Sequence, residues 1–309
     1  METLLLRLDS LLLDCCELYN TPATDCYAQN QVCSDAVGVV CKMRVASCGV
    51  RRRDAVGDQI DMTGPALIRM DGSLGDNEVH VWHTDLSAQG AAVDKAFPLL
   101  DSDEQNRAAR FIVPEPRVQF ILSRAFLRIA LGQYLRIEPQ DVRFRTAAQG
   151  KPELARDAGL YFNLSHTDGE TVIAVTRAGR VGVDVERIRK NLDPLALGIR
   201  FFSPQESEWL QAQPPDQRFD AFFACWTAKE AYVKACGAGL SAPLDGFGVI
   251  PRAGESELHL EIYGKPAESK RWSMWQFDLG PELRSAVAVE AVNCKVRLGS
   301  WSLACGGIS

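Results

Sequence analysis

The stretch FDAFFACWTAKEAYVKACGAGL, from Phe219 to Leu240, decides the fold of this 309-residue chain. Its large aromatic residues recur at steps of three and four, the spacing of one helix face: Phe219, Phe222, Phe223 and Trp226. Gly237 and Gly239 follow the last helical turn, where a glycine in the left-handed conformation often ends a helix. The pattern therefore predicts one long helix that ends at about Gly237, with its aromatic face buried.

The most informative residue of this helix is Glu230, because it continues the inward-facing stripe four positions after Trp226. A buried carboxylate costs free energy unless a cation or hydrogen bonds meet it. Lys234 lies one turn further along the same face, and Lys229 flanks Glu230. Two interpretations stay open from the helix alone: a solvated Glu230–Lys234 pair worth about 0.3 kcal/mol, or an acid with a function.

Composition sets broad limits on what the protein does. The net charge of −6 argues against general nucleic-acid binding, which needs a basic face. No apolar run approaches the ~18 residues of a membrane span, and the acidic N-terminus fits no signal or transit peptide. We therefore expect a cytoplasmic protein with no membrane contact, whose ten cysteines are reduced thiols. None of the early cysteines forms a C-x-x-C pair, which argues against a zinc site.

The N-terminal quarter differs from the remainder of the chain. Residues 1–76 show no sustained period, and we expect an extension that is partly disordered and lies outside the catalytic unit. Organised sequence begins with an alternating strand at 79–86, followed by helices from Asp101 and over 118–135. Five arginines accompany these helices, either facing an anion or as surface charge: Arg107, Arg110, Arg117, Arg124 and Arg128.

A second informative stretch is VGVDVE, over 181–186, which alternates as a strand does. Asp184 and Glu186 point to the same face, with α-carbons ~7 Å apart. A hard divalent cation would relieve their repulsion and use their oxygens. A strand with a solvated outer face is the simpler interpretation of a D-x-E pair alone. Residues 177–180, just before this strand, form either a hairpin turn or a junction between subdomains.

A faint internal echo suggests two related halves. RFIVPE at 110–115 resembles RFFSPQ at 200–205, and in each half a long helix ending near a glycine follows, at Gly132 and at Gly237. Ser203 and Glu206 form the capping-box pattern with Pro204 at the first helical position, a structural signal. We expect an α/β (α+β) fold with an extension at 1–76, a first subdomain at 77–179 and a second at 180–309.

Four motifs in this order resemble a known family: GKP at 150–152, FNLSH at 162–166, GVDVE at 182–186 and FFSPQE…WTAKEAYVKACGAGL from 201 to 240. Together they are similar to the 4′-phosphopantetheinyl transferases of the surfactin (Sfp) type, over roughly residues 79–249. The resemblance implies the 4′-phosphopantetheinyl transferase fold, two similar α/β subdomains with pseudo-twofold symmetry and coenzyme A (CoA) in the cleft between them. The extension before residue 77 departs from the family pattern.

The resemblance also implies roles for individual residues. Asp184, Glu186 and Glu230 match the acids that hold Mg²⁺ on the CoA pyrophosphate. The remaining matches are basic or polar residues around the CoA phosphates: Lys229 and Lys234 at the pyrophosphate, Lys151, Ser165 and His166 at CoA phosphates, and Arg107, Arg110 and Arg117 for the 3′-phosphate. The arginine alignment is the loosest, because the spacing there is not diagnostic.

The implied reaction transfers the 4′-phosphopantetheine arm of CoA to a serine of an apo acyl or peptidyl carrier protein and releases adenosine 3′,5′-bisphosphate. Glu230 or Glu186 would be the base for the serine hydroxyl, and Lys234 would stabilise the leaving phosphate. We expect a monomer, because two subdomains of one chain already build the cleft. Two other functions stay open: a non-catalytic module that binds CoA or the carrier protein, and a transferase that moves an acyl group without magnesium.

Overall fold

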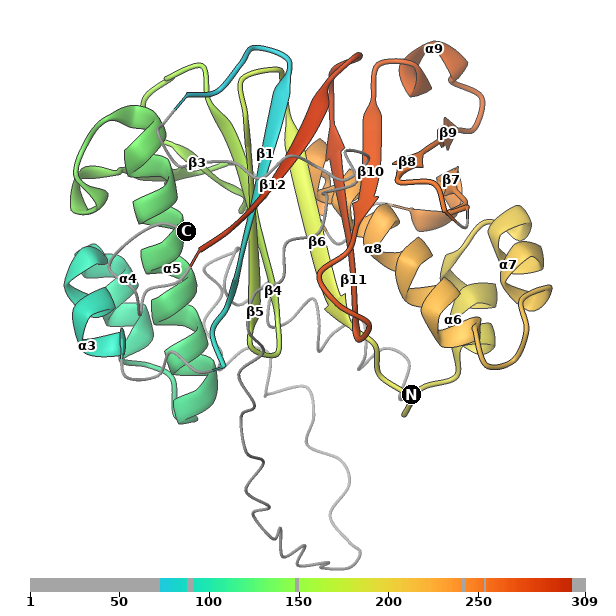
Figure 1. Cartoon of the computed structure of the whole chain (residues 1–309), viewed down its shortest axis with the longest axis horizontal. Coiled ribbons are helices and arrows are strands. Elements are labelled where there is room, and N and C mark those ends of the chain that lie inside the picture. Colours follow the sequence, from blue (N-terminus) through green and yellow to red (C-terminus); the bar gives the residue numbers. More distant parts are fainter. Residues whose placement is uncertain (1–72, 88–91, 148–149, 240–242, 253, 302–309) are drawn as a thin grey trace, which may run out of the picture.

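The computed structural model describes residues 73–87, 92–147, 150–239, 243–252 and 254–301. Two four-stranded sheets lie between two groups of helices, so that the layers follow the order helices, sheet, sheet, helices (Figure 1). The expected extension at 1–76 lies outside the described residues except for its last four positions.

The first sheet contains an N-terminal strand, a β-hairpin and the last strand of the chain. Its order is β12-β1-β5-β4. The strands are β1 (Glu78–Asp85), β4 (Tyr161–Thr167), β5 (Glu170–Thr176) and β12 (Lys295–Ser300). β1 pairs parallel with β12 and antiparallel with β5. The strand expected at 79–86 is confirmed, although it is almost fully buried rather than half-buried.

The outer face of the first sheet carries three helices: α3 (Val93–Ala96), α4 (Ser102–Ala108) and α5 (Pro114–Leu135). α4 begins with a capping box between Asp101 and Glu104, which confirms the helix start predicted there. The end of the helix expected over 118–135 is confirmed, because α5 ends at Leu135, but its left-handed cap is Arg136 (φ 56°) and not a glycine near Gly132. A Cβ on Gly132 would lie 2.8 Å from the carbonyl oxygen of Ile137, so this glycine lets the next segment pack closely.

The second half repeats this arrangement. Its sheet has the order β6-β11-β10-β8, with strands β6 (Val181–Arg187), β8 (Glu257–Leu258), β10 (Ser273–Phe277) and β11 (Leu283–Val289). Its main helices are α6 (Pro194–Phe201), α7 (Pro204–Gln211) and α8 (Arg218–Cys236). The smaller elements are η2 (Phe97–Leu99), η3 (Pro139–Asp141), η5 (Leu244–Gly246), α9 (Pro266–Ser269) and two hairpin-like pairs, β2 (Phe144–Thr146) with β3 (Pro152–Leu154) and β7 (Phe247–Val249) with β9 (Leu260–Ile262).

The two sheets pack on each other through a layer of valines. Val79 and Val81 of β1 and Val172 of β5 share one buried cluster with Val183 and Val287 of the second sheet. Burying such β-branched side chains between two sheets is the usual core of a β-sandwich. Residues 177–180 are therefore the junction between the halves and not a hairpin turn, because β5 and β6 belong to different sheets.

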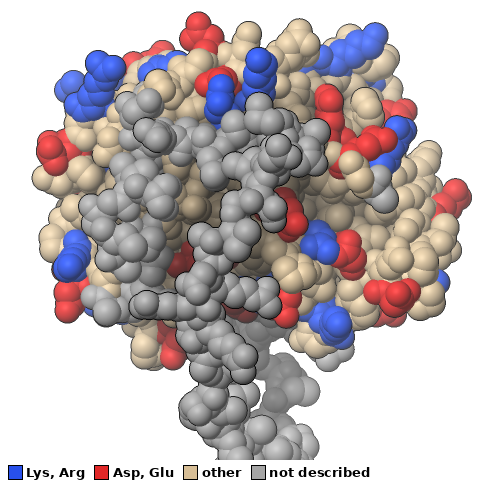
Figure 2. All heavy atoms as spheres, in the orientation of Figure 1, with Lys and Arg blue, Asp and Glu red and all other residues tan. Residues whose placement is uncertain are grey.

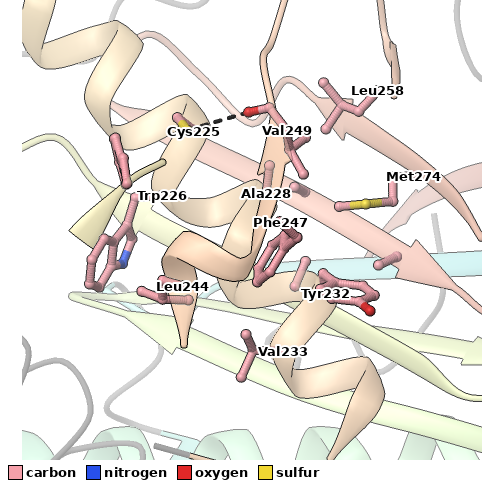
Figure 3. Packing of buried hydrophobic residues seen from close by; sticks show 14 of the residues in the cluster. Cys225, Trp226, Ala228, Tyr232, Val233, Leu244, Phe247, Val249, Leu258 and Met274 are labelled. Carbon is pink, nitrogen blue, oxygen red and sulfur yellow. Dashed lines mark hydrogen bonds between the residues drawn. The ribbon is translucent and has the colours of Figure 1, made fainter. Parts of the chain in front are cut away.

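The helix predicted from residue 219 is confirmed as α8, which ends at Gly237 with φ 66°. It is buried almost all round rather than on one aromatic face, because sheet β6-β11-β10-β8 lies under it and the β7 region covers it. Figure 3 shows this packing, in which side chains of α8 meet those of η5, β7, β8 and β10: Cys225, Trp226, Ala228, Tyr232 and Val233 with Leu244, Phe247, Val249, Leu258 and Met274.

The C-terminal strand changes the domain boundary expected from the sequence. β12 leaves the second half and pairs with β1 of the first sheet. Trp301 then stacks on Phe126 of α5, with ring centroids 4.8 Å apart. The segment 295–301 therefore belongs to the first half, whereas the sequence assigned all of 180–309 to the second.

Candidate functional site

The predicted acids lie on two elements that pack against each other: Asp184 and Glu186 on β6, and Glu230 on α8. A Cβ on Gly182 would lie 2.1 Å from the carbonyl oxygen of Ala231, so the helix backbone rests directly on the strand there. Asp184 and Glu186 share the face of Gly182, because alternate residues of a strand point the same way. Asp184 is 3% exposed, Glu186 7% and Glu230 4%. The expectation that Glu230 points inward is confirmed.

A compact polar cluster joins the two halves at this point. The Lys234 ammonium lies 2.8 Å from Asp184 Oδ1 and donates to Ser165 Oγ at 3.0 Å. The Ser165 hydroxyl donates to the same Asp184 oxygen at 3.0 Å. Ser165 comes from β4 in the first half, whereas Asp184 and Lys234 come from β6 and α8 in the second. The structure thus brings together three of the residues that the sequence singled out.

The three acids do not form a ready-made metal cluster. Among the described residues, no group of three or more His, Cys, Asp or Glu side chains is arranged to hold a metal ion. Lys234 already contacts Asp184, and the Arg189 guanidinium lies 3.5 Å from a carboxylate oxygen of Glu186. These cations contact one oxygen of Asp184 and one of Glu186, whereas the buried Oδ2 atom of Asp184 accepts no hydrogen bond from the described residues; a metal shared by the three acids stays a prediction.

Lys151 connects the same two elements from the first half. Its ammonium donates to the carbonyl oxygens of Val181 at 2.8 Å and Lys234 at 2.7 Å. It therefore holds the start of β6 against the end of α8. Burial lowers the pKa of Lys151 to about 8, since a desolvated ammonium is disfavoured. Lys151 also lines a cavity of about 430 Å³ between the β2–β3 region and the end of α8.

Lys229 lies elsewhere than the resemblance implied. Its ammonium is fully buried and donates to both carboxylate oxygens of Glu206, at 2.8 and 2.7 Å, and to the carbonyl oxygen of Phe247 at 2.7 Å. These three acceptors use all three ammonium protons. Lys229 therefore holds α8 to α7 and β7 inside the second core and is not available to a pyrophosphate, which corrects the expected role.

The five arginines separate into two groups. Arg124 and Arg128 pair with the carboxylate of Glu104, and Arg128 also donates to the carbonyl oxygen of Val142 at 2.8 Å. These two hold α4 and η3 against α5. Arg107 packs over the ring of Phe120, Arg110 is exposed and Arg117 is half-buried. All three belong to the first half: Arg107 is on α4, Arg110 follows it and Arg117 is on α5.

His166 and Arg117 lie near the same end of the first sheet. Half-buried His166 is on β4, one residue before Thr167 at its end. Arg117 is on α5, two residues before Gln119. The side-chain oxygen of Gln119 accepts a hydrogen bond from Gly169 N in the turn that follows β4, which places this part of α5 near that end of the sheet. The sequence missed two further residues at the junction, Asn163 and Thr167, which alternate with Ser165 along β4. It also missed the role of Glu206, taken only as part of a helix cap, in the core of the second half.

Comparison with known proteins agrees with this arrangement of two halves. The family model for the 4′-phosphopantetheinyl transferase superfamily matches residues 180–290, and the model described as 4′-phosphopantetheinyl transferase, N-terminal, matches 87–178. The 4′-phosphopantetheinyl transferase HetI of Nostoc sp. is 40% identical over 172 residues, which cover 55% of this chain and 73% of that protein. This chain belongs to the 4′-phosphopantetheinyl transferase superfamily, and it is an enzyme of the holo-[acyl-carrier-protein] synthase type.

Other relatives are more distant. The 4′-phosphopantetheinyl transferase Sfp of Bacillus subtilis is 28% identical over 184 residues, covering 59% of this chain and 80% of that protein. A solved holo-[acyl-carrier-protein] synthase from Thermotoga maritima aligns with a TM-score of 0.28 and 17% identity, over 36% of this chain and 62% of that one.

Two further features concern the surface charge and the lengths of the helices. In the face shown in Figure 2, Lys and Arg are interspersed with Asp and Glu and form no single large basic patch. None of the helices in the described part of the chain is long and apolar enough to cross a membrane.

Proposed function

We propose that this enzyme transfers 4′-phosphopantetheine from CoA to a serine hydroxyl of an apo acyl or peptidyl carrier protein, and releases adenosine 3′,5′-bisphosphate. The observation that supports this most is the buried Ser165–Asp184–Lys234 cluster. It lies where the two halves meet and carries residues from three motifs of the family. A nucleotide diphosphate needs cations and hydrogen-bond donors in such a place.

Magnesium is the proposed metal, held by Asp184, Glu186 and Glu230. Carboxylate oxygens are its preferred protein ligands, and all three acids are buried where β6 meets α8. Buried carboxylates near Lys234 and Arg189 fit a site that exchanges these cation contacts for a metal when CoA arrives. When bound, Mg²⁺ would offset the charge of the CoA diphosphate and orient its β-phosphate for in-line attack.

The chain's own residues perform the remaining steps. Glu230 or Glu186 takes the proton from the carrier serine hydroxyl, which makes the oxygen a nucleophile. The Lys234 ammonium stabilises charge on the leaving phosphate as the P–O bond breaks. Ser165, His166 and Lys151 contact CoA phosphates from the first half. Arg107, Arg110 and Arg117 attract the 3′-phosphate.

One chain supplies both sides of this site, which favours a monomer as the active unit. Carrier proteins are usually acidic, so a local basic and apolar docking surface is expected despite the net charge of −6. We place the reaction in the cytoplasm, where apo-carriers and CoA would meet the enzyme.

The test is transfer to an apo-carrier in the presence of CoA and Mg²⁺, read by mass spectrometry. The wild type should add one phosphopantetheine per carrier. Asp184→Ala and Glu230→Ala should each reduce the rate by about a hundredfold or more, because each removes a ligand or the base. The exposed acid Glu208 of α7 provides the control, and Glu208→Ala should retain full activity. CoA binding without transfer by the wild type would favour the non-catalytic alternative.

A further inference from the structure

Three side chains of β4 cap the free edge of β6. β6 is the outermost strand of the second sheet, and its other edge pairs with β11. Its backbone N–H groups at Val183, Val185 and Arg187 donate to side-chain oxygens of Asn163 (2.8 Å), Ser165 (3.4 Å) and Thr167 (3.2 Å). Each bond joins residues 20 positions apart, so the bonds form a regular ladder between the two halves.

The ladder matters because buried backbone N–H groups must be paired. An outer strand presents unpaired donors that another strand would ordinarily satisfy. Here the acceptors are side chains, and Asn163 is 2% and Ser165 1% exposed. The opposite face of β4 carries Phe162 and Leu164 into the core under α5. One face of β4 therefore packs in the core, and the other face accepts hydrogen bonds from the backbone of β6.

The middle bond of the ladder belongs to the proposed site. Ser165 Oγ accepts from Val185 N and also contacts Asp184 and Lys234. A slide of β6 by one residue would present valines in place of Asp184 and Glu186. A slide by two would place Asp184 at the position of Gly182. There the Cβ of any side chain would lie 2.1 Å from the backbone of α8, which is too close. The ladder and Gly182 together allow one register.

We propose that Asn163 and Thr167 are positioning residues of the transfer site. They fix β6 in the register that places Asp184 and Glu186 beside Ser165 and Lys234. They touch neither substrate nor metal and act through β6. This inference rests on the proposed function for its kinetic readout, while its structural readout is independent of activity.

Thr167 offers the sharpest substitutions. Thr167→Val keeps the shape and removes the acceptor, whereas Thr167→Ser keeps the hydroxyl. The matched control is Thr176→Val in β5, which removes the bonds from Thr176 Oγ1 to Glu78 O (2.7 Å) and from Ala178 N (3.1 Å) within the first sheet. We expect Thr167→Val to lower kcat/KM about threefold to tenfold and to raise the Mg²⁺ concentration for half-maximal rate.

In the same assay Thr167→Ser should restore wild-type values. Thr176→Val should lower the melting temperature at least as much, yet leave the Mg²⁺ requirement unchanged. The double variant Asn163→Ala/Thr167→Val should show a larger fall in kcat/KM and a larger rise in the Mg²⁺ requirement than Thr167→Val alone. If Thr167→Val keeps wild-type kinetics, or if Thr176→Val shifts the Mg²⁺ requirement equally, the positioning role is refuted.

Hydrogen exchange separates a failure of the ladder from a failure of the proposed function. The amides of Val183, Val185 and Arg187 should exchange faster in Asn163→Ala/Thr167→Val than in the wild type, and Thr176→Val should leave them protected. This holds even for an enzyme without transfer activity. Unchanged protection over 181–187 in the double variant would overturn the ladder itself.

Discussion

At the scale of single residues, two lysines of α8 that look equivalent in the sequence have different surroundings. Lys229 and Lys234 lie on the same helix five positions apart, and both have the chemistry of a phosphate ligand. Lys229 uses its three protons on Glu206 and Phe247 in the core. Lys234 meets Asp184 and Ser165 at the junction. Only the second therefore contacts residues of both halves.

Gly182 yields a prediction about close packing. Gly182→Ala would place a methyl carbon 2.1 Å from the Ala231 carbonyl oxygen and 2.3 Å from the Ala235 nitrogen. Both atoms are helix backbone, so the strand and α8 must separate. We expect a loss of about 3 kcal/mol or more of unfolding free energy, measured by urea denaturation.

The control for that change is Gly246→Ala. At Gly246 the nearest atom to a Cβ is the side-chain Cγ of Pro243 at 3.7 Å, an ordinary contact. Its stability should remain within about 0.5 kcal/mol of the wild type. Equal stabilities of Gly182→Ala and the wild type would contradict the packing of α8 on β6.

The sequence predicted many of the residues that line the candidate site, but it did not predict which residues they contact. Periodicity placed Glu230 on an inward face, and alternation placed Asp184 and Glu186 together. The partner of Lys229 is Glu206, 23 positions earlier. Asn163 and Thr167 carry no signal in isolation, because hydrogen bonds to a strand edge 20 residues away depend on how two sheets meet. The cations that occupy Asp184 and Glu186 were unpredictable for the same reason.

At the scale of elements, one buried carboxylate organises α7, α8 and β7. Glu206 completes the capping box of α7 through Ser203 N, pairs with Lys229, and accepts from Val249 N at 2.7 Å. The Cys225 thiol also lies near it, at 3.6 Å. The capping-box pattern predicted only the first of these contacts.

This arrangement gives a prediction that distinguishes a structural lysine from a phosphate ligand. Lys229→Met should lower the unfolding free energy by about 3 kcal/mol or more, because it leaves the buried Glu206 carboxylate without its cation. Lys229→Met/Glu206→Gln should recover part of that loss, since both charges are gone. Urea denaturation measures the stability. The KM for CoA should stay near the wild-type value in each folded variant.

A matched comparison for this pair is Lys234→Met, which removes the lysine proposed to face the phosphate. It should lower kcat strongly while changing stability less. If Lys229→Met is stable and has a raised KM for CoA, the structural role is wrong and Lys229 contacts the pyrophosphate.

Element ends were predictable where local chemistry fixes them. Gly237 ends α8 in the left-handed conformation, as the sequence indicated. The end of α5 at Leu135 was also predicted, but its cap was not, because Gly132 lies inside the helix, where it allows close packing, and Arg136 adopts the cap conformation. The pairing of β12 with β1 joins residues more than 200 positions apart and leaves no periodic signal in either strand.

At the scale of the whole molecule, two facing sheets with outer helices bring motifs from both halves to one junction. β4 and Lys151 come from the first half, and β6 and α8 from the second. β12 then returns to the first sheet and ties the end of the described chain to its beginning. The two family models match one half each, at 87–178 and at 180–290.

The central claim is that the acids at the contact of β6 and α8 bind a divalent cation together with CoA. Electron paramagnetic resonance of Mn²⁺, used in place of Mg²⁺, tests it directly on the full chain. The account predicts one tightly bound Mn²⁺ per chain when CoA is present, and its loss in Asp184→Asn at unchanged fold. CoA that binds equally to both proteins, with Mn²⁺ remaining free in solution in each, would contradict it.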